Sequence, residues 1–138
     1  MRTFVDTNVL VYAVDASEPA KRSAAAAFLE ARADELVLSA QVLSEFYVVV
    51  TRRLARPLSE ADAADHVADL ARLPVAALDA DVVRDGIHVS RKAGLSYWDG
   101  LILATARAAG CDVVATEDLT GGATIGGVAI ENPFAAAG

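Results

Sequence analysis

Short runs of apolar and β-branched residues alternate along the chain with segments whose apolar positions recur at helical spacing. The apolar runs predict four strands and a fifth, short edge strand, at Thr3–Val5, Leu36–Leu38, Val75–Leu78, Asp112–Ala115 and Val128–Ile130. The periodic segments predict a compact helix or turn followed by five helices, at Thr7–Val14, Pro19–Ala33, Ala40–Leu54, Glu60–Leu73, Ala80–Ala93 and Tyr97–Ala109. Strands separated by helices indicate an α/β fold: a mostly parallel four- to five-stranded sheet inside a three-layer α/β/α sandwich.

Capping residues support these boundaries. Ser39 and Asp79 precede two of the helices, and Ser59 begins a capping box whose third helical residue is Asp62. Gly94 and Gly110 follow the last two helices, where a glycine commonly ends a helix. Residues next to the predicted helix ends therefore support the predicted starts of these helices and the ends of the last two.

Length and composition limit the class of protein. The chain has 138 residues, 54% of them hydrophobic and 22% charged, so we expect residues 1–138 to form one globular domain. The single cysteine, Cys111, rules out an internal disulfide and is compatible with a reducing cytoplasm, the location we expect. Acidic and basic residues interrupt every long apolar run, and Asp6 interrupts any signal peptide, so we expect no membrane segment.

The net charge is −7, which argues against binding of polyanions by overall attraction. Two interpretations remain open. The surplus acids can simply keep the protein soluble, or some of them are gathered in one place, where they would need cations.

Four carboxylates are expected at one edge of the predicted sheet. Asp6 directly follows the first strand and Asp118 lies just after the fourth, so both stand at the carboxyl edge, where ligands bind in parallel sheets. Asp99 begins the helix that runs back to that strand, and its helix start therefore returns to the same edge. Glu45 lies in the second turn of the helix that leaves the second strand.

Each acid also has a structural interpretation. Asp6 could cap the helix at Thr7, Asp99 could close a capping box with Ser96, and Asp118 could shape a turn. Glu45 is harder to explain in this way. It lies on the helix side that carries Val42, Phe46 and Val49, and an acid on an apolar side usually has a partner, because an unpaired buried charge is costly.

If the four carboxylates meet, they titrate as a coupled group and need a cation. Mg²⁺ and Mn²⁺ choose oxygen ligands and can activate water or stabilise charge on a phosphate. Such a site suits the hydrolysis of phosphodiester bonds, and the metal would reverse the local charge for a polyanionic substrate.

Four motifs resemble those of PIN-domain proteins, in the same order and spacing. They are Phe4-Val5-Asp6-Thr7-Asn8, Ser44-Glu45-Phe46-Tyr47, Ser96-Tyr97-Trp98-Asp99-Gly100-Leu101 and Ala115-Thr116-Glu117-Asp118. Each motif is weakly specific, but the ordered set covers nearly the whole chain. A chain of this size with no further module looks most like the VapC toxins of type II toxin–antitoxin pairs.

The resemblance implies a PIN-like fold and an endoribonuclease that depends on Mg²⁺ or Mn²⁺. Asp6, Glu45, Asp99 and Asp118 would be its catalytic and metal-binding acids, with Glu117 as the second choice for the fourth ligand. Supporting hydroxyl and amide groups would come from Thr7, Asn8 and Thr116. The resemblance also implies a small antitoxin partner, which blocks the site, and a homodimer.

Other features leave further possibilities. Basic residues near two helix ends favour the helix dipole and could also bind RNA phosphates; they are Arg52, Arg53, Arg56, Arg91 and Lys92. An inactive PIN-fold scaffold would carry the same motifs without cleavage. A receiver-type Mg²⁺-binding signalling domain would need an acceptor aspartate closing a central strand and a late lysine, and no lysine follows Lys92. The sequence leaves open which RNA is cut, and whether one metal binds or two.

Overall fold

The computed structural model describes residues 1–135. Its helices are α1 (Thr7–Tyr12), α2 (Pro19–Ala31), α3 (Ala40–Arg52), α4 (Glu60–Leu70), α5 (Ala80–Ala93) and α6 (Tyr97–Ala108). Its strands are β1 (Thr3–Val5), β2 (Leu36–Ser39), β3 (Val75–Ala76), β4 (Val113–Ala115), β5 (Thr124–Ile125) and β6 (Val128–Glu131). The predicted alternation of strands and helices is confirmed, with helix ends that lie up to three residues earlier than expected.

The strands form one six-stranded sheet in the order β3-β2-β1-β4-β6-β5. The four pairings among β3, β2, β1, β4 and β6 are parallel, and β5 pairs with β6 antiparallel. The expected edge position of Val128–Ile130 is wrong, because β6 lies between β4 and β5. A two-residue strand, β5, covers the edge that β6 would otherwise leave open.

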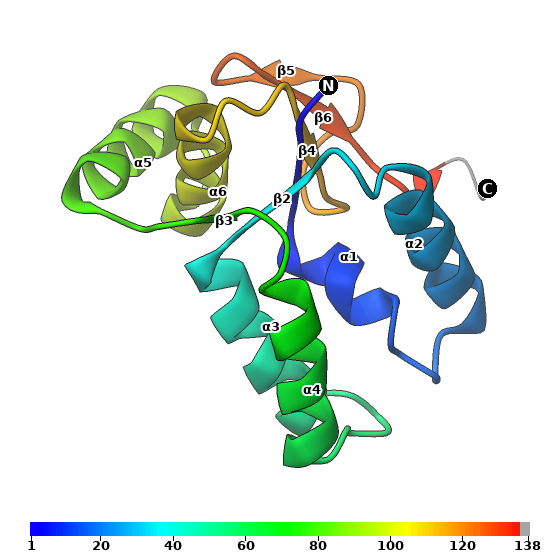
Figure 1. Ribbon diagram of the computed structural model, residues 1–138. Helices are drawn as coiled ribbons and strands as arrows, with labels where there is room; N and C mark the ends of the chain where they lie inside the picture. Colours follow the sequence, from blue (N-terminus) through cyan, green and yellow to red (C-terminus); the bar gives the residue numbers. More distant parts are fainter. Residues whose placement is uncertain (136–138) are drawn as a thin grey trace.

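Helices surround this sheet on several sides. Figure 1 shows α5 and α6 next to each other on one side of the sheet and α2 on the other. The pair α3 and α4 extends from the end of the sheet where β1 runs into α1 (Figure 1). Ser39, Ser59 and Asp79 cap α3, α4 and α5 through their side chains, as predicted. Gly94 ends α5 in the left-handed conformation, with a φ of 69°.

The core lies between the central strands and the helices. Its largest fully buried side chains come from β1, β2, α3 and α6, and include Phe4, Leu38, Phe46, Leu101 and Leu103. The single cysteine, Cys111, is also buried. Burial of this apolar surface, worth on the order of 25 cal/mol per Å², stabilises the sheet, and the parallel pairing of β1 with β4 places their carboxyl ends side by side.

Two glycines let α5 and α6 approach each other closely. A Cβ atom on Gly100 would lie 2.6 Å from the carbonyl oxygen of Gly86, and one on Gly86 would lie 3.0 Å from the Cα of Leu101. Only glycine fits at position 100, while at position 86 an added Cβ would be tightly packed. The spacing of the two helices, and therefore the position of the first turn of α6, depends on these two residues. No helix within residues 1–135 is long and apolar enough to span a bilayer.

Candidate active site

Asp6 stands at the carboxyl end of β1, where it begins α1. Its backbone N–H donates to the carbonyl oxygen of Ala115 over 3.0 Å, which continues the pairing of β1 with β4 by one residue. One carboxylate oxygen accepts from the Thr7 N–H over 2.7 Å, and the other accepts from the Thr116 hydroxyl over 2.8 Å. The predicted capping role of Asp6 is therefore confirmed, and only part of its carboxylate is used for it.

Burial makes the charge on Asp6 costly. The residue is 8% exposed, and burial raises the pKa of its carboxyl group from 3.8 to about 6. The hydrogen bonds from Thr116 and Thr7 lower this pKa, while the nearby charges of Asp118 and Glu45 raise it further. Asp6 is thus a buried acid that faces other acids, the environment that is typical of functional carboxylates.

Thr116 and Asn8 join the end of β4 to α1. The Thr116 side chain is fully buried, and its hydroxyl accepts from Asn8 Nδ2 over 3.1 Å and from the Asp118 N–H over 3.1 Å. Asn8 Nδ2 also donates to Asp118 Oδ2 over 3.0 Å. With its donation to Asp6, the Thr116 hydroxyl uses its one hydrogen and both lone pairs. This network fixes the position of Asp118 relative to Asp6.

A pocket of about 360 Å³ opens over these groups. Its carboxylates come from four places in the chain, Asp6 after β1, Asp15 after α1, Glu45 on α3 and Asp118 after β4. Thr7 also lines the pocket, and its hydroxyl oxygen is buried and has no hydrogen-bond partner within residues 1–135. The pocket therefore combines a surplus of negative charge with a buried polar oxygen that lacks a partner.

Glu45 lies at the rim of the pocket and not in an apolar interior. Its side chain is exposed, contrary to the expectation from its apolar neighbours on α3, and it accepts from Gln41 Nε2 over 2.7 Å. The apolar stripe of the helix buries Val42, Phe46 and Val50 instead. Because Glu45 sits beside that stripe, it reaches the pocket while keeping contact with solvent.

Glu117 is held away from the pocket by its own partners. Lys21 Nζ lies 3.0 Å from Glu117 Oε2, and the Tyr12 hydroxyl donates to Glu117 Oε1 over 3.0 Å. The same Lys21 ammonium lies 4.5 Å from the centre of the Tyr12 ring, which packs edge-on against Phe134. Between the two neighbouring acids, the geometry favours Asp118, because Asp118 lines the pocket and Glu117 does not.

Asp99 is the one predicted catalytic acid that the structure does not bring into the pocket. It lies in the first turn of α6, where its N–H donates to the Ser96 hydroxyl over 3.2 Å. It is absent from the pocket lining and from the charges that act on the pKa of Asp6. The basic candidates also lie elsewhere; Arg52, Arg53, Arg56, Arg91 and Lys92 are all exposed and outside this pocket.

One pocket residue escaped the sequence reasoning. Asp15 is 6% exposed and lines the pocket, and its carboxylate accepts from the Ser17 N–H over 3.0 Å and from the Ser17 hydroxyl over 2.6 Å. An Asp followed two residues later by Ser is a turn signature, so the local signal pointed to a turn and not to the site. Only the tertiary fold shows that this turn closes the pocket.

The donor set suits a hard divalent cation. The pocket offers carboxylate and hydroxyl oxygens, the ligands that Mg²⁺ and Mn²⁺ choose. In the described part of the chain, no positively charged side chain is among the groups that shift the pKa of Asp6, so a bound cation would stabilise its buried negative charge. Within residues 1–135, no three Asp, Glu, His or Cys side chains are close enough to form a complete metal site as they stand. Mg²⁺ usually keeps several waters, so carboxylates at this separation can still share one hydrated ion.

Comparison with known proteins identifies the sequence pattern and the fold. A family profile described as the PIN domain matches residues 3–120. Among curated proteins, none matches the sequence. A toxin–antitoxin complex from Klebsiella pneumoniae is 20% identical, with a TM-score of 0.71 over 95% of this chain and 97% of the other.

Two further solved structures have the same fold. VapBC2 from Rickettsia felis, bound to a DNA fragment from its promoter, is 20% identical, with a TM-score of 0.66 over 96% of this chain and 98% of the other. VapC20 from Mycobacterium tuberculosis, described as a sarcin–ricin loop cleaving toxin, is 19% identical, with a TM-score of 0.58 over 81% of this chain and 86% of the other. At these identities the similarity establishes the fold.

Proposed function

Because this chain belongs to the PIN-domain family, we propose that it is a metal-dependent endoribonuclease that hydrolyses RNA phosphodiester bonds. We further propose that it is the toxin of a toxin–antitoxin pair. One observation carries the proposal: four acids line one pocket, and among them is the buried carboxyl group of Asp6, whose pKa is raised to about 6. Without a bound cation, these neighbouring negative charges lower the stability of the folded protein. Acids in such an unfavourable arrangement are typical of functional sites.

Each pocket residue has a role in this proposal. Asp6 and Asp118 would hold the cation, Mg²⁺ or Mn²⁺, and Glu45 at the rim would bind its water ligands or position the attacking water. The Thr116 hydroxyl and the Asn8 amide hold Asp6 and Asp118 in place, and the unpartnered Thr7 hydroxyl would bind a water or a phosphate oxygen. When bound, the cation would supply an activated water and stabilise charge on the phosphate.

Asp99 remains the fourth proposed acid, from outside the pocket. It lies in the first turn of α6, which packs closely against α5 at Gly100. A small movement of that helix pair toward the pocket on binding of metal or RNA would bring Asp99 to the other acids. Such loop and helix adjustments commonly complete an active site only when the substrate binds.

The proposed partners follow from the relatives. The solved structures with this fold include complexes of a toxin with its antitoxin, in Klebsiella pneumoniae and in Rickettsia felis. By analogy, we propose that a small antitoxin protein covers the acid pocket of this chain. The homodimer that the motif resemblance implies remains a separate proposal.

A catalytically inactive scaffold is the second candidate, and the position of Asp99 outside the pocket favours it. The decisive experiment is sequencing of RNA 5′ ends after total bacterial RNA is incubated with the purified protein and Mg²⁺ or Mn²⁺. New ends that disappear with EDTA and in the Asp99→Asn variant would support the nuclease. A folded protein that binds Mn²⁺ but makes no new ends would favour the scaffold.

A matched pair of variants tests the fourth ligand. We expect Asp118→Asn to lower cleavage by about 100-fold or more, because Asp118 lines the pocket, and Glu117→Gln to change it by less than about threefold. Both substitutions remove one negative charge from adjacent residues, so the general electrostatic effect is the same. Initial cleavage rates of a mapped RNA site at saturating Mg²⁺ measure both. Equal losses would show that Glu117 also serves the metal.

A further inference from the structure

Helix α5 presents a stripe of basic residues to solvent. Arg84, His88, Arg91 and Lys92 follow one another at helical spacing, so they share one face of the helix, and all four are exposed. The stripe is about 12 Å long, from the rise of a helix over eight residues. In a chain with a net charge of −7, such a local surplus of positive charge is unexpected.

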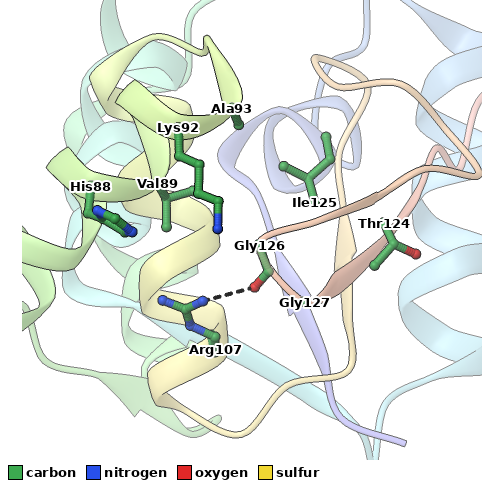
Figure 2. Close-up of a pocket in the computed structure, with 9 residues that line it drawn as sticks. All are labelled: His88, Val89, Lys92, Ala93, Arg107, Thr124, Ile125, Gly126 and Gly127. Atoms are coloured by element: carbon green, nitrogen blue, oxygen red, sulfur yellow. Dashed lines mark hydrogen bonds between the residues drawn. The ribbon is translucent and has the colours of Figure 1, made fainter.

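This face borders two adjoining pockets. One of about 440 Å³ is lined by Arg84, Ile87, His88, Arg91 and Lys92. The other, of about 580 Å³, shares His88 and Lys92 with it and reaches Arg107 and the turn at Gly126–Gly127. Figure 2 shows His88 and Lys92 on the helix, Arg107 below them, and the glycine turn opposite. The two pockets meet at His88 and Lys92, and we refer to them together as the groove along α5.

The positive charge in this groove is only partly neutralised. Arg107 is paired with Asp85 over 2.6 Å and donates to the carbonyl oxygen of Gly126 over 3.2 Å, and Arg84 is paired with Asp81 over 2.7 Å. Arg91 and Lys92 have no ion-pair partner among residues 1–135. Two cations therefore remain available for an anionic ligand.

The turn at Gly126–Gly127 adds a polar wall without side chains. Both glycines have a positive φ, 58° and 82°, which a tight hairpin turn between β5 and β6 requires. Gly126 packs against Val89 and its carbonyl oxygen accepts from Arg107, but nothing lies within 4 Å of the place where a Cβ of Gly127 would be, so a ligand can approach the backbone there. The groove is therefore bounded by cations on one side and by bare backbone on the other.

The groove extends between two ends of the molecule. Its glycine turn lies at the amino edge of the sheet, because it precedes β6, which runs parallel to β4. Arg91 and Lys92, in contrast, lie in the last turn of α5, which the short segment 94–96 joins to the first turn of α6. Helix α6 connects the two ends, because Asp99 is in its first turn and Arg107 in its last. Eight residues of helix separate them, which is about 12 Å.

We propose that the groove along α5 is a second RNA-binding site, which binds backbone phosphates of the substrate strand away from the cleaved bond. This inference rests on the proposed ribonuclease function for the identity of the polyanion. A linear strand of phosphates fits because the unpaired charges line an elongated, open groove and not a closed cavity for one small anion. Arginine can bind a phosphate with two parallel hydrogen bonds, which adds to the charge.

Binding of a labelled RNA without cleavage tests the proposal. The probe is a fluorescein-labelled 12-nucleotide single-stranded RNA of mixed sequence, and its anisotropy is followed in EDTA at several salt concentrations. We expect the double variant Arg91→Glu with Lys92→Glu to bind roughly tenfold more weakly than the unmodified protein. We also expect the slope of affinity against salt to fall by about 1.4, the value for two lost contacts to a single strand.

The matched control is the double variant Arg22→Glu with Arg72→Glu. Both residues are exposed and have no ion-pair partner among residues 1–135. This variant therefore has the same net charge as the α5 variant, but its substitutions lie outside the groove. We expect it to keep most of the affinity. The neutral variant Arg91→Gln with Lys92→Gln, expected to lose affinity by a smaller factor, replaces the charge-reversed one if that fails to fold.

Three results would overturn the proposal. They are equal loss in both charge-reversed variants, no loss in either, and a poly-glutamate peptide that occupies the groove in preference to the RNA. Because the measurement is made in EDTA, it does not depend on catalysis. If the unmodified protein cleaves RNA and the Arg91→Glu, Lys92→Glu variant binds RNA as tightly as it does, this inference alone is overturned. If that variant binds RNA more weakly but the unmodified protein cleaves no RNA, the proposed function alone is overturned.

Discussion

Replacing Asp6 with asparagine should abolish RNA cleavage while making the metal-free protein more stable. Asp6 is the most buried acid of the catalytic set, and both of its oxygens are fixed by Thr7 and Thr116. Without its charge the pocket loses the centre of its cation site, so we expect cleavage to fall by about a thousandfold or more. Asparagine is also a preferred helix cap, so α1 should keep its start.

The gain in stability depends on pH in a defined direction. The pKa of the Asp6 carboxyl is 3.8 when the chain is unfolded and about 6 in the folded protein. Below pH 3.8 the group is protonated in both states and costs nothing. As the pH rises from about 4 to about 6, the unfolded chain releases the proton first, and the folded protein loses roughly 3 kcal/mol of stability. Above pH 6 this loss is complete.

Urea unfolding of the metal-free protein at pH 4 and at pH 7.5 measures the effect. The unmodified protein should lose stability between the two values by this contribution, and Asp6→Asn should lack it. Mn²⁺ should then raise the melting temperature of the unmodified protein but not of Asp6→Asn. The control is Asp118→Asn, whose side chain is exposed, and which should lose cleavage without a comparable gain in stability. An Asp6→Asn protein that still cleaves RNA would contradict the proposed site.

Replacing Gly100 with alanine should be strongly destabilising. The added Cβ would lie 2.6 Å from the carbonyl oxygen of Gly86, and 2.7 Å and 2.9 Å from Ser90 Cβ and N. These neighbours belong mostly to backbone, which can give way only if α5 and α6 separate. We expect a loss of about 3 kcal/mol in the free energy of unfolding. For a chain of this length, that lowers the melting temperature by on the order of 10 °C.

The same substitution should also lower cleavage, because Gly100 directly follows Asp99. Separation of α5 from α6 would move the first turn of α6, and with it the proposed fourth acid. Gly86→Ala is the matched control, since its Cβ would meet Leu101 Cα at 3.0 Å and the flexible Cδ1 at 3.2 Å. We expect it to cost about 1 kcal/mol at most, partly offset by the helix preference of alanine. Equal melting temperatures for the two variants would refute the packing argument.

The sequence predicted the order of the elements and the helix starts because these signals are local. Ser39, Ser59 and Asp79 each accept from a backbone N–H three residues ahead, as their positions before apolar periodic segments predict. The strand β5 was missed because two residues before a pair of glycines carry no alternation. Because β5 was not predicted, no strand was expected beyond β6, and β6 was therefore wrongly predicted to be the edge strand.

The site was predictable only as far as topology determines it. The carboxyl ends of parallel strands share one edge, which places Asp6 and Asp118 at the same edge, and the pairing of β1 with β4 brings them close together. The direction of Glu117 depends on Lys21, which lies 96 residues earlier in the chain. Asp99 was placed correctly at a helix start, but its distance from the pocket depends on how α6 packs against the sheet and against α5. The contact of Lys21 with Glu117 and the packing of α6 both join residues that are far apart in the chain, so no short sequence pattern predicts them.

The two edges of the sheet have a consequence for how copies of this protein meet. Both edge strands, β3 and β5, have only two residues, so each presents few unpaired backbone groups to another chain. Short edges are a common protection against strand-to-strand aggregation, in which sheets extend from one molecule into the next. We therefore expect concentrated solutions to resist β-type aggregation, and self-association to use helical surfaces.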